Sequence, residues 1–373
     1  LILPLNMFRS TLLRLSTLLL VLPFILAQSQ CSATQKCPAS APCCSEYGFC
    51  GTGSYCHQGC EPLHSNTLTS CRPNPLCQSQ STNFPADLDR LQLNATKYNG
   101  NATAYDWVVN AGYVVPTSDG LRLTLNKTNS GSKISSTKYI MYGQIDFTMQ
   151  TSKWAGVVSA AITMSDVKDE IDWEWPGTAT SEAQTNIWFL GIANYTNTLG
   201  QKVEMGTNTA EGFHTYTLNW QPDYLQWLID GRVVRTINRA DTLSSSGRYE
   251  YPSTPSRIQL SIWPGGIPAS AQGTIDWAGG LIQWNEPEYT QNGYYWNTIK
   301  AVTVKCGPTA NVTAGTRGWA YMGNTSLSVP YVAVTNASTM LSSAMRGVTS
   351  PLTLMGAISL VGVVLLGAVS SVL

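Results

Sequence analysis

The sequence predicts an all-β fold, either a sandwich or a barrel, and three observations lead to this class. Apolar and polar residues alternate in short segments such as 121–125, 142–149 and 214–220, which is the period of a half-buried strand. Turn residues separate these segments, and Asp230-Gly231 is typical of a two-residue β-hairpin. No long segment repeats its apolar residues with a helical period, so many short strands must form the core.

The strand pattern continues in order along residues 78–306. After a turn at Pro222-Asp223, a partner for the 214–220 strand is expected, and the Asp230-Gly231 hairpin leads into another strand. Further strands are expected at residues 224–229, 233–237, 257–263 and 301–305.

The length of the chain indicates how many domains it forms, and its charge argues against nucleic-acid binding. The chain has 373 residues, 22 basic and 22 acidic side chains, and a formal net charge of +0. This length suits one large domain with an accessory module. Proteins that bind nucleic acid normally carry a basic face, so the balanced charge argues against nucleic acid as a partner.

The N-terminal part, taken from Met7, has the pattern of a secretory signal peptide. Arg9 and Arg14 flank a short apolar run, and Ala27 is a small residue at a suitable cleavage point. We expect residues 1–27 to be removed on secretion. The alternative is an uncleaved signal anchor, for which the apolar run is short.

Cysteines concentrate in the next segment, where nine of the ten lie between residues 31 and 77 and Cys306 stands alone. In a secreted chain this density predicts a disulfide scaffold. A zinc site is the alternative, but the adjacent pair Cys43-Cys44 fits zinc-ligand spacing poorly. Nine is an odd number, so one cysteine of this cluster must pair with Cys306 or stay free.

Residues 307–343 are rich in Thr, Asn, Ala, Ser and Gly, and we expect a poorly ordered, glycosylated stalk. Trp319 and Tyr321 are exceptions that could pack back on the domain. In a secreted chain, Asn-X-Ser/Thr sites predict a glycosylated surface. They lie at Asn94, Asn101, Asn126, Asn194, Asn311, Asn324 and Asn336.

The C-terminal part, from about residue 352 to 373, is an uncharged apolar run. A spacer and the small residues Ser342, Ser343 and Ala344 precede it, and Asn336-Ala337-Ser338 is another candidate for the small residues. This is the pattern of a glycolipid (GPI) anchor signal, with residues 344–373 discarded. We expect the anchor at Ser342, on the outer surface of the plasma membrane and in the cell wall. The alternative is a transmembrane helix, but no basic anchor follows it.

Acidic residues are most concentrated in residues 169–175, Asp-Glu-Ile-Asp-Trp-Glu-Trp. Successive side chains of a strand point to opposite faces, so Glu170, Asp172 and Glu174 share one face. Ile171 and the two tryptophans share the other face, which must enter the core. Three carboxylates are therefore expected in a row on a rigid strand.

Carboxyl groups so close together cannot all ionise easily, so at least one pKa should rise. A retaining glycosidase needs this arrangement, with one carboxylate as nucleophile and one protonated carboxyl as acid, about 5–5.5 Å apart. The alternatives are a solvated strand face, which would usually mix in Lys, Thr or Ser, and a calcium site, which would suit loops better.

The segment Glu170-Ile-Asp-Trp-Glu174 resembles the E-x-D-x-E signature of glycoside hydrolase family 16, and the longer segment resembles the fungal Crh subgroup. The resemblance implies a jelly-roll sandwich of two curved antiparallel sheets over about residues 72–306. It implies cleavage and transfer of chitin chains to β-glucan or chitin. It further implies that Glu170 is the nucleophile, Asp172 the residue assisting it, and Glu174 the acid/base.

Flat aromatic rings match the C–H faces of sugars, so tryptophans are candidates for a sugar cleft. By the resemblance, Trp263 and Trp277 line it. Gln184 and Asn186 could bind sugar hydroxyls, and Trp220 is a further candidate. The alternative for each tryptophan is a place in the core of the sandwich.

Residues 28–71 resemble the hevein-like chitin-binding module, carbohydrate-binding family 18, through the pattern Cys43-Cys-Ser-Glu-Tyr-Gly-Phe-Cys-Gly-Thr-Gly-Ser-Tyr-Cys56. The alternative is a disulfide knot used only for stability or protein contact. The resemblance implies a chitin-binding face formed by Ser45, Tyr47, Phe49 and Tyr55. It implies the disulfides Cys31–Cys44, Cys37–Cys50, Cys43–Cys56 and Cys60–Cys71, leaving Cys77 for Cys306.

We therefore expect a secreted, wall-anchored retaining transglycosylase. Its partners would be chitin, β-glucan and, through the lipid anchor, the plasma membrane. We expect a monomer with no cofactor and no metal at the site. The alternatives are a hydrolase of β-glucan or chitin and a catalytically idle chitin-binding wall protein.

Overall fold

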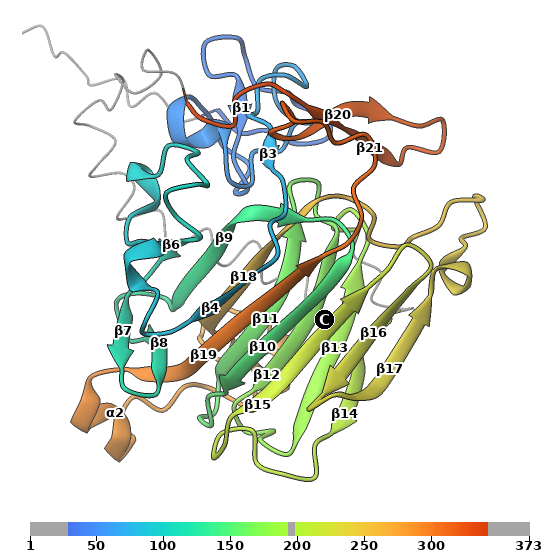
Figure 1. Ribbon diagram of the computed structural model, residues 1–373. Helices are drawn as coiled ribbons and strands as arrows, with labels where there is room; N and C mark the ends of the chain where they lie inside the picture. Colours follow the sequence, from blue (N-terminus) through green and yellow to red (C-terminus); the bar gives the residue numbers. More distant parts are fainter. Residues whose placement is uncertain (1–28, 193–197, 342–373) are drawn as a thin grey trace, which may run out of the picture.

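The structure is a computed structural model that describes residues 29–192 and 198–341 (Figure 1). The expected signal peptide (residues 1–27), the site at Asn194 and the expected anchor site Ser342 lie outside the described residues. Within the described ranges, none of the helices is both long and apolar enough to span a bilayer.

Two eight-stranded sheets pack face to face, one behind the other in Figure 1. We call the first the β10 sheet. Its order is β17-β16-β15-β10-β19-β8-β7, with β4 paired to β19. Its strands are β4 (Gln80–Asn83), β7 (Val114–Thr117), β8 (Gly120–Leu125), β10 (Gly143–Gln150), β15 (His214–Trp220), β16 (Tyr224–Ile229), β17 (Arg232–Asn238) and β19 (Tyr295–Cys306).

The second sheet, which we call the β12 sheet, has the order β14-β13-β12-β11-β18-β9-β6-β5. Its pairs are antiparallel, except for the short parallel contact of β5 with β6. Its strands are β5 (Leu91–Gln92), β6 (Trp107–Ala111), β9 (Ser132–Ile140), β11 (Val157–Ser165), β12 (Glu170–Pro176), β13 (Glu182–Trp188), β14 (Gln201–Glu204) and β18 (Ser256–Pro264).

Helices are short and lie in the connections. The α-helices are α1 (Gln272–Trp277) and α2 (Pro287–Asn292), and the 3-10 helices are η1 (Gly53–Cys56), η2 (Leu88–Arg90), η3 (Ala95–Lys97) and η5 (Arg239–Thr242). The expected all-β sandwich is therefore confirmed.

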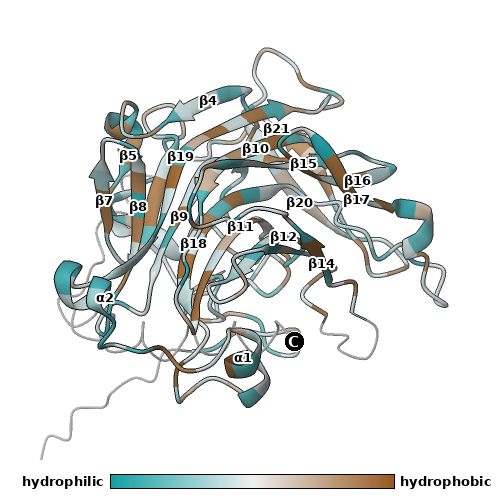
Figure 2. Cartoon of the chain, turned by 90° about the horizontal axis from the view of Figure 1, so that it is seen from below, coloured by the Kyte–Doolittle hydropathy of each residue, from teal (hydrophilic) through white to brown (hydrophobic). Residues whose placement is uncertain are grey.

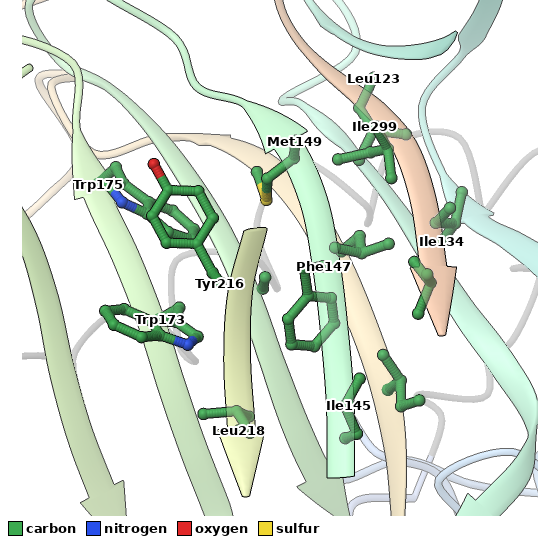
Figure 3. Packing of buried hydrophobic residues seen from close by; sticks show 14 of the residues in the cluster. Leu123, Ile134, Ile145, Phe147, Met149, Trp173, Trp175, Tyr216, Leu218 and Ile299 are labelled. Carbon is green, nitrogen blue, oxygen red and sulfur yellow. The ribbon is translucent and has the colours of Figure 1, made fainter. Parts of the chain in front are cut away.

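The core lies between the two sheets because apolar and polar residues alternate along their strands (Figure 2). In β10 every second residue is buried, and Phe147 and Met149 are fully buried. Trp175 of β12 meets Tyr216 of β15 edge-on, with ring centroids 4.5 Å apart (Figure 3). Trp173 stacks on Trp175 at 6.0 Å. These rings join the two sheets directly below the acidic strand.

The N-terminal module has short strands, β1 (Cys43–Cys44) and β2 (Cys50–Gly51), and is held by disulfides. Too few apolar side chains gather here for an independent core, so cross-links replace it. The five disulfides are those expected: Cys31–Cys44, Cys37–Cys50, Cys43–Cys56, Cys60–Cys71 and Cys77–Cys306.

The expectation of a poorly ordered stalk after residue 307 is wrong for much of that segment. Strands β20 (Gly318–Asn324) and β21 (Pro330–Thr335) form a hairpin that pairs with β3 (Asn74–Pro75) and lies beside the N-terminal module (Figure 1). Trp319 and Tyr321 are buried in it. Burial of these two rings supplies the apolar contact that an isolated polar stalk would lack.

Candidate active site

Strand β12 carries the three carboxyl groups on one face and its apolar residues on the other. Ile171, Trp173 and Trp175 are at most 1 % exposed and belong to the core. The alternation therefore directs Glu170, Asp172 and Glu174 to the opposite surface of the β12 sheet, which we call the acidic face.

The strand is fixed from behind by the β10 sheet. The indole Nε1 of Trp227 donates to the backbone oxygen of Asp172 at 2.9 Å, and that of Trp173 donates to the backbone oxygen of Thr217 at 3.4 Å. Both bonds are buried, so the carboxyl row stands on a rigid support.

Burial is the largest influence on all three carboxyl groups, and it raises each pKa because the charged form loses water. The pKa of Glu170 rises to about 7, although Asp172 and the charges of Lys168 and Lys133 oppose the shift. The pKa of Glu174 rises to about 8 through burial and then through the charge of Glu170.

Asp172, between the two glutamates, is only 2 % exposed. Burial and then the charges of Glu170 and Glu174 raise its pKa well above the usual range, while Trp188 opposes the shift. This shift favours the protonated form of Asp172, which can share its proton with Glu170. Among the described residues, its Oδ1 has no hydrogen-bond partner.

The neighbouring strand β13 adds a second polar row to the acidic face. Paired residues of antiparallel strands point to the same face, and Gln184 lies opposite Glu174, while Asn186 lies opposite Asp172. Both expected sugar-binding amides therefore stand beside the carboxyl row.

The third residue of this row, Trp188, lies opposite Glu170 and interacts with Asp172. Sequence reasoning missed it. The period of two that relates Gln184 to Asn186 continues to Trp188, so the signal was present.

Trp263 and Trp277 lie together at the Glu174 end of the row. Their rings stack with centroids 5.7 Å apart and an interplanar angle of 21°. Trp263 interacts with Glu174, and the Nε1 of Trp277 donates to the Oε1 of Gln184 at 2.8 Å. Both rings are half-buried, so part of each stays open to a ligand.

The expectation that Trp220 lines a sugar cleft is wrong. Trp220 follows Tyr216 and Leu218 at a period of two on β15, and all three side chains enter the core. The ring is 1 % exposed and its Nε1 donates to the backbone oxygen of Pro252. A sugar cannot reach it.

Asp169 begins the acidic motif but has a structural role. It is fully buried, and its Oδ2 accepts hydrogen bonds from the backbone of Ser253 at 2.9 Å and the hydroxyl of Thr254 at 2.7 Å. Its Oδ1 accepts one from the backbone of Leu190 at 3.1 Å. It therefore ties two loops to the start of β12.

The four residues expected to bind chitin lie in one loop and the following turn of the N-terminal module. Tyr47 is 41 % exposed, whereas Ser45, Phe49 and Tyr55 are half-buried. The ring of Tyr55 occupies the space beside Gly51, where a Cβ would lie 2.5 Å from it. Gly51 thus lets the ring fold against the β1–β2 hairpin.

In the part of the chain that the structure describes, the group of potential metal ligands within mutual reach is Cys31, Cys37 and Cys50. All three sulfurs belong to disulfides, so they offer no thiolate to a metal.

Comparison with known proteins agrees with this site. The model of the family described as glycosyl hydrolases family 16 matches residues 101–279, which include the whole acidic motif. Crh-like protein 2 of Aspergillus fumigatus is 42 % identical over 291 residues, covering 77 % of this chain and 65 % of that protein. Congo red hypersensitive protein 2 of Saccharomyces cerevisiae is 37 % identical, covering 77 % and 62 %. The chain thus spans less than two thirds of both relatives.

Among solved structures, apo Crh5 transglycosylase is 32 % identical with a TM-score of 0.52, covering 64 % of this chain and 89 % of that one. Crh5 transglycosylase in complex with NAG is 31 % identical with a TM-score of 0.54, covering 66 % and 90 %. The chain therefore belongs to glycosyl hydrolases family 16, among its Crh-like members.

Proposed function

We propose that the chain is a retaining transglycosylase that cleaves chitin and transfers the released chain to β-glucan or chitin. The observation that carries this proposal is the row of Glu170, Asp172 and Glu174 on one face of β12, in which loss of water raises the pKa of all three carboxyl groups. The name and bound NAG of the Crh5 transglycosylase structure support this substrate class.

The surroundings of the two glutamates suit the reaction. Lys168 and Lys133 favour the charged form of Glu170, and the charge of Glu170 favours the protonated form of Glu174. Glu170 attacks the anomeric carbon and forms a glycosyl–enzyme ester while Glu174 protonates the departing oxygen. Asp172 holds the Glu170 carboxyl by sharing its proton.

Transfer reverses these roles. Glu174, now a base, takes the proton of an acceptor hydroxyl whose oxygen attacks the anomeric carbon, and Glu170 leaves as carboxylate. The stacked Trp263 and Trp277 offer ring faces for a sugar, and Gln184 and Asn186 offer amides for its hydroxyls.

The remaining expectations belong to the same proposal. Chitin binds the N-terminal module through Ser45, Tyr47, Phe49 and Tyr55, because rings on a cross-linked loop form a stacking platform. The Asn-X-Ser/Thr sites carry glycans, and a lipid at Ser342 anchors the protein in the wall and at the membrane.

An acceptor assay tests this function. The full chain is incubated with chitin oligomers and a fluorescent β-glucan oligomer, and products are separated by size. We expect labelled products longer than the acceptor, abolished by Glu170→Gln and retained by Glu211→Gln, an exposed glutamate outside the row. Free reducing ends without labelled product would indicate a hydrolase, and neither product would indicate an idle binding protein.

A further inference from the structure

An ion pair attaches the N-terminal module to the β12 sheet. Its residues belong neither to the disulfides nor to the carboxyl row. The Oε2 of Glu46, in the module, lies 2.8 Å from the Nη2 of Arg257 on β18. Its Oε1 lies 3.4 Å from the Nζ of Lys133 on β9, and its backbone oxygen accepts a bond from Lys168 at 3.0 Å.

This contact is built into the interior. The Arg257 side chain is 1 % exposed and that of Glu46 is 11 % exposed. Gly59 has a φ of +83°, and a Cβ there would lie 2.5 Å from the Nη2 of Arg257. The backbone nitrogen of Gly59 also donates to the hydroxyl of Tyr139 at 3.2 Å. The absence of a side chain at Gly59 thus leaves room for the pair.

The strand register places this contact on the acidic face. Arg257 lies opposite Met164, which lies opposite Glu170, and Lys133 is linked in the same way through β18 and β11 to Glu174. With neighbouring strands about 4.8 Å apart, the two cations stand roughly 10 and 14 Å from β12. An oligosaccharide that crosses the strands from the carboxyl row would therefore arrive at the module.

Tyr47 follows Glu46 in the chain and lies beside Lys133, at the β9 end of the row that contains Glu174. Its ring is 41 % exposed, and the Nζ of Lys133 lies 5.5 Å from the ring centroid. The residue that docks the module therefore also sets the position of an exposed aromatic ring beside the acidic face.

We propose that Glu46 is a positioning residue that docks the module so that one β-linked N-acetylglucosamine chain contacts Tyr47 and the carboxyl row together. The module then acts as an extension of the binding site and favours long donor chains. This inference rests on the proposed function, because it takes the same polysaccharide as ligand.

The test measures binding and turnover against donor length. In a Glu170→Gln background, which binds without turnover, calorimetry with chitin oligomers of increasing length should show affinity that rises once an oligomer can span both sites. Tyr47→Ala and Glu46→Gln should each lower the ratio of long-oligomer to short-oligomer affinity about tenfold, as expected for one lost stacking contact. In the active enzyme, the corresponding ratio of KM values should change in parallel.

Two controls separate this effect from unfolding. Tyr224→Ala removes a tyrosine that is 37 % exposed on β16, in the other sheet, and should leave the length ratio unchanged. For Glu46→Gln, the variant should still bind insoluble chitin, which reports an intact module, and its disulfides should stay complete by mass spectrometry.

Three results would overturn the inference. The first is a ratio of long-oligomer to short-oligomer affinity that stays unchanged in Tyr47→Ala or in Glu46→Gln. The second is a ratio that rises in either variant, which would show that the module blocks the face, and the third is a wild-type affinity that does not depend on oligomer length. Absence of transfer by the wild-type enzyme would instead refute the proposed function, while the affinity ratio would still decide this inference.

Discussion

The two faces of β12 are formed by alternating residues of one strand, but they change the stability of the fold in opposite directions. Ile171, Trp173 and Trp175 bury apolar surface between the sheets, which stabilises the fold. The carboxyl groups of Glu170 and Glu174 are held where their charged forms lose water, which is unfavourable. Burial of the apolar face therefore compensates for the unfavourable loss of water at the carboxyl groups, which an isolated strand could not do.

Glu170→Gln should produce the largest effect. It should lower activity and, at high pH, increase the stability of the fold. Loss of the proposed nucleophile should lower kcat by roughly 10⁴-fold or more in the acceptor assay. Because the folded-state pKa of Glu170 is raised, its contribution to stability is present at low pH and is lost as pH rises toward about 7.

Glutamine cannot ionise, so the variant should be more stable than the wild type at pH 8 and differ less at pH 4. Thermal unfolding at both pH values checks this. A variant that is less stable at pH 8 would show that the acidic face does not oppose folding.

Trp173→Ala tests the other face. Removing a fully buried indole that stacks on Trp175 should lower the free energy of unfolding by about 3–5 kcal/mol. Denaturant unfolding measures the change, and the loss should be similar at pH 4 and pH 8 because no charge is involved. A pH-dependent loss would mean that the two faces are not energetically separate.

The two faces also differ in how much of them the sequence could reveal. Alternation within one strand identifies both faces of β12, and the same rule would have placed Trp220 in the core and Trp188 on the acidic face. For both tryptophans, the position within the period of two decides which face the ring joins, and residue type alone does not reveal it.

Contacts between distant segments leave no such pattern. Glu46 and Arg257 are 211 residues apart and occur in unrelated motifs, so only the folded chain brings them together. The β20–β21 hairpin was missed because its polar composition concealed the alternation of Trp319 and Tyr321.

Glu174→Gln tests the proposed role of this residue as the catalytic acid. The wild-type rate should fall on the alkaline side when Glu174 loses its proton, at a pH above the ordinary glutamate value of 4.5 because burial and the Glu170 charge raise its pKa. Glutamine cannot supply the proton, so kcat should drop by about 10²–10⁴-fold.

The remaining activity of Glu174→Gln should lose this alkaline limb, which a pH–rate profile of kcat would show. A limb that persists unchanged in the variant would assign it to another group.

Trp277→Phe should have the smallest effect, because it alters only the edge of the acidic face. The phenyl ring keeps part of the stack on Trp263 but lacks the indole nitrogen that bonds Gln184 at 2.8 Å. Losing one neutral hydrogen bond and some ring area should raise KM for chitin oligomers about five- to tenfold with little change in kcat.

The matched control is Trp296→Phe, which changes a half-buried tryptophan of β19 in the other sheet. The KM of this variant should stay at the wild-type value. If Trp277→Phe instead lowered kcat at constant KM, the stacked pair would act on Glu174 rather than on the sugar, because Trp263 contacts both Trp277 and that carboxyl group.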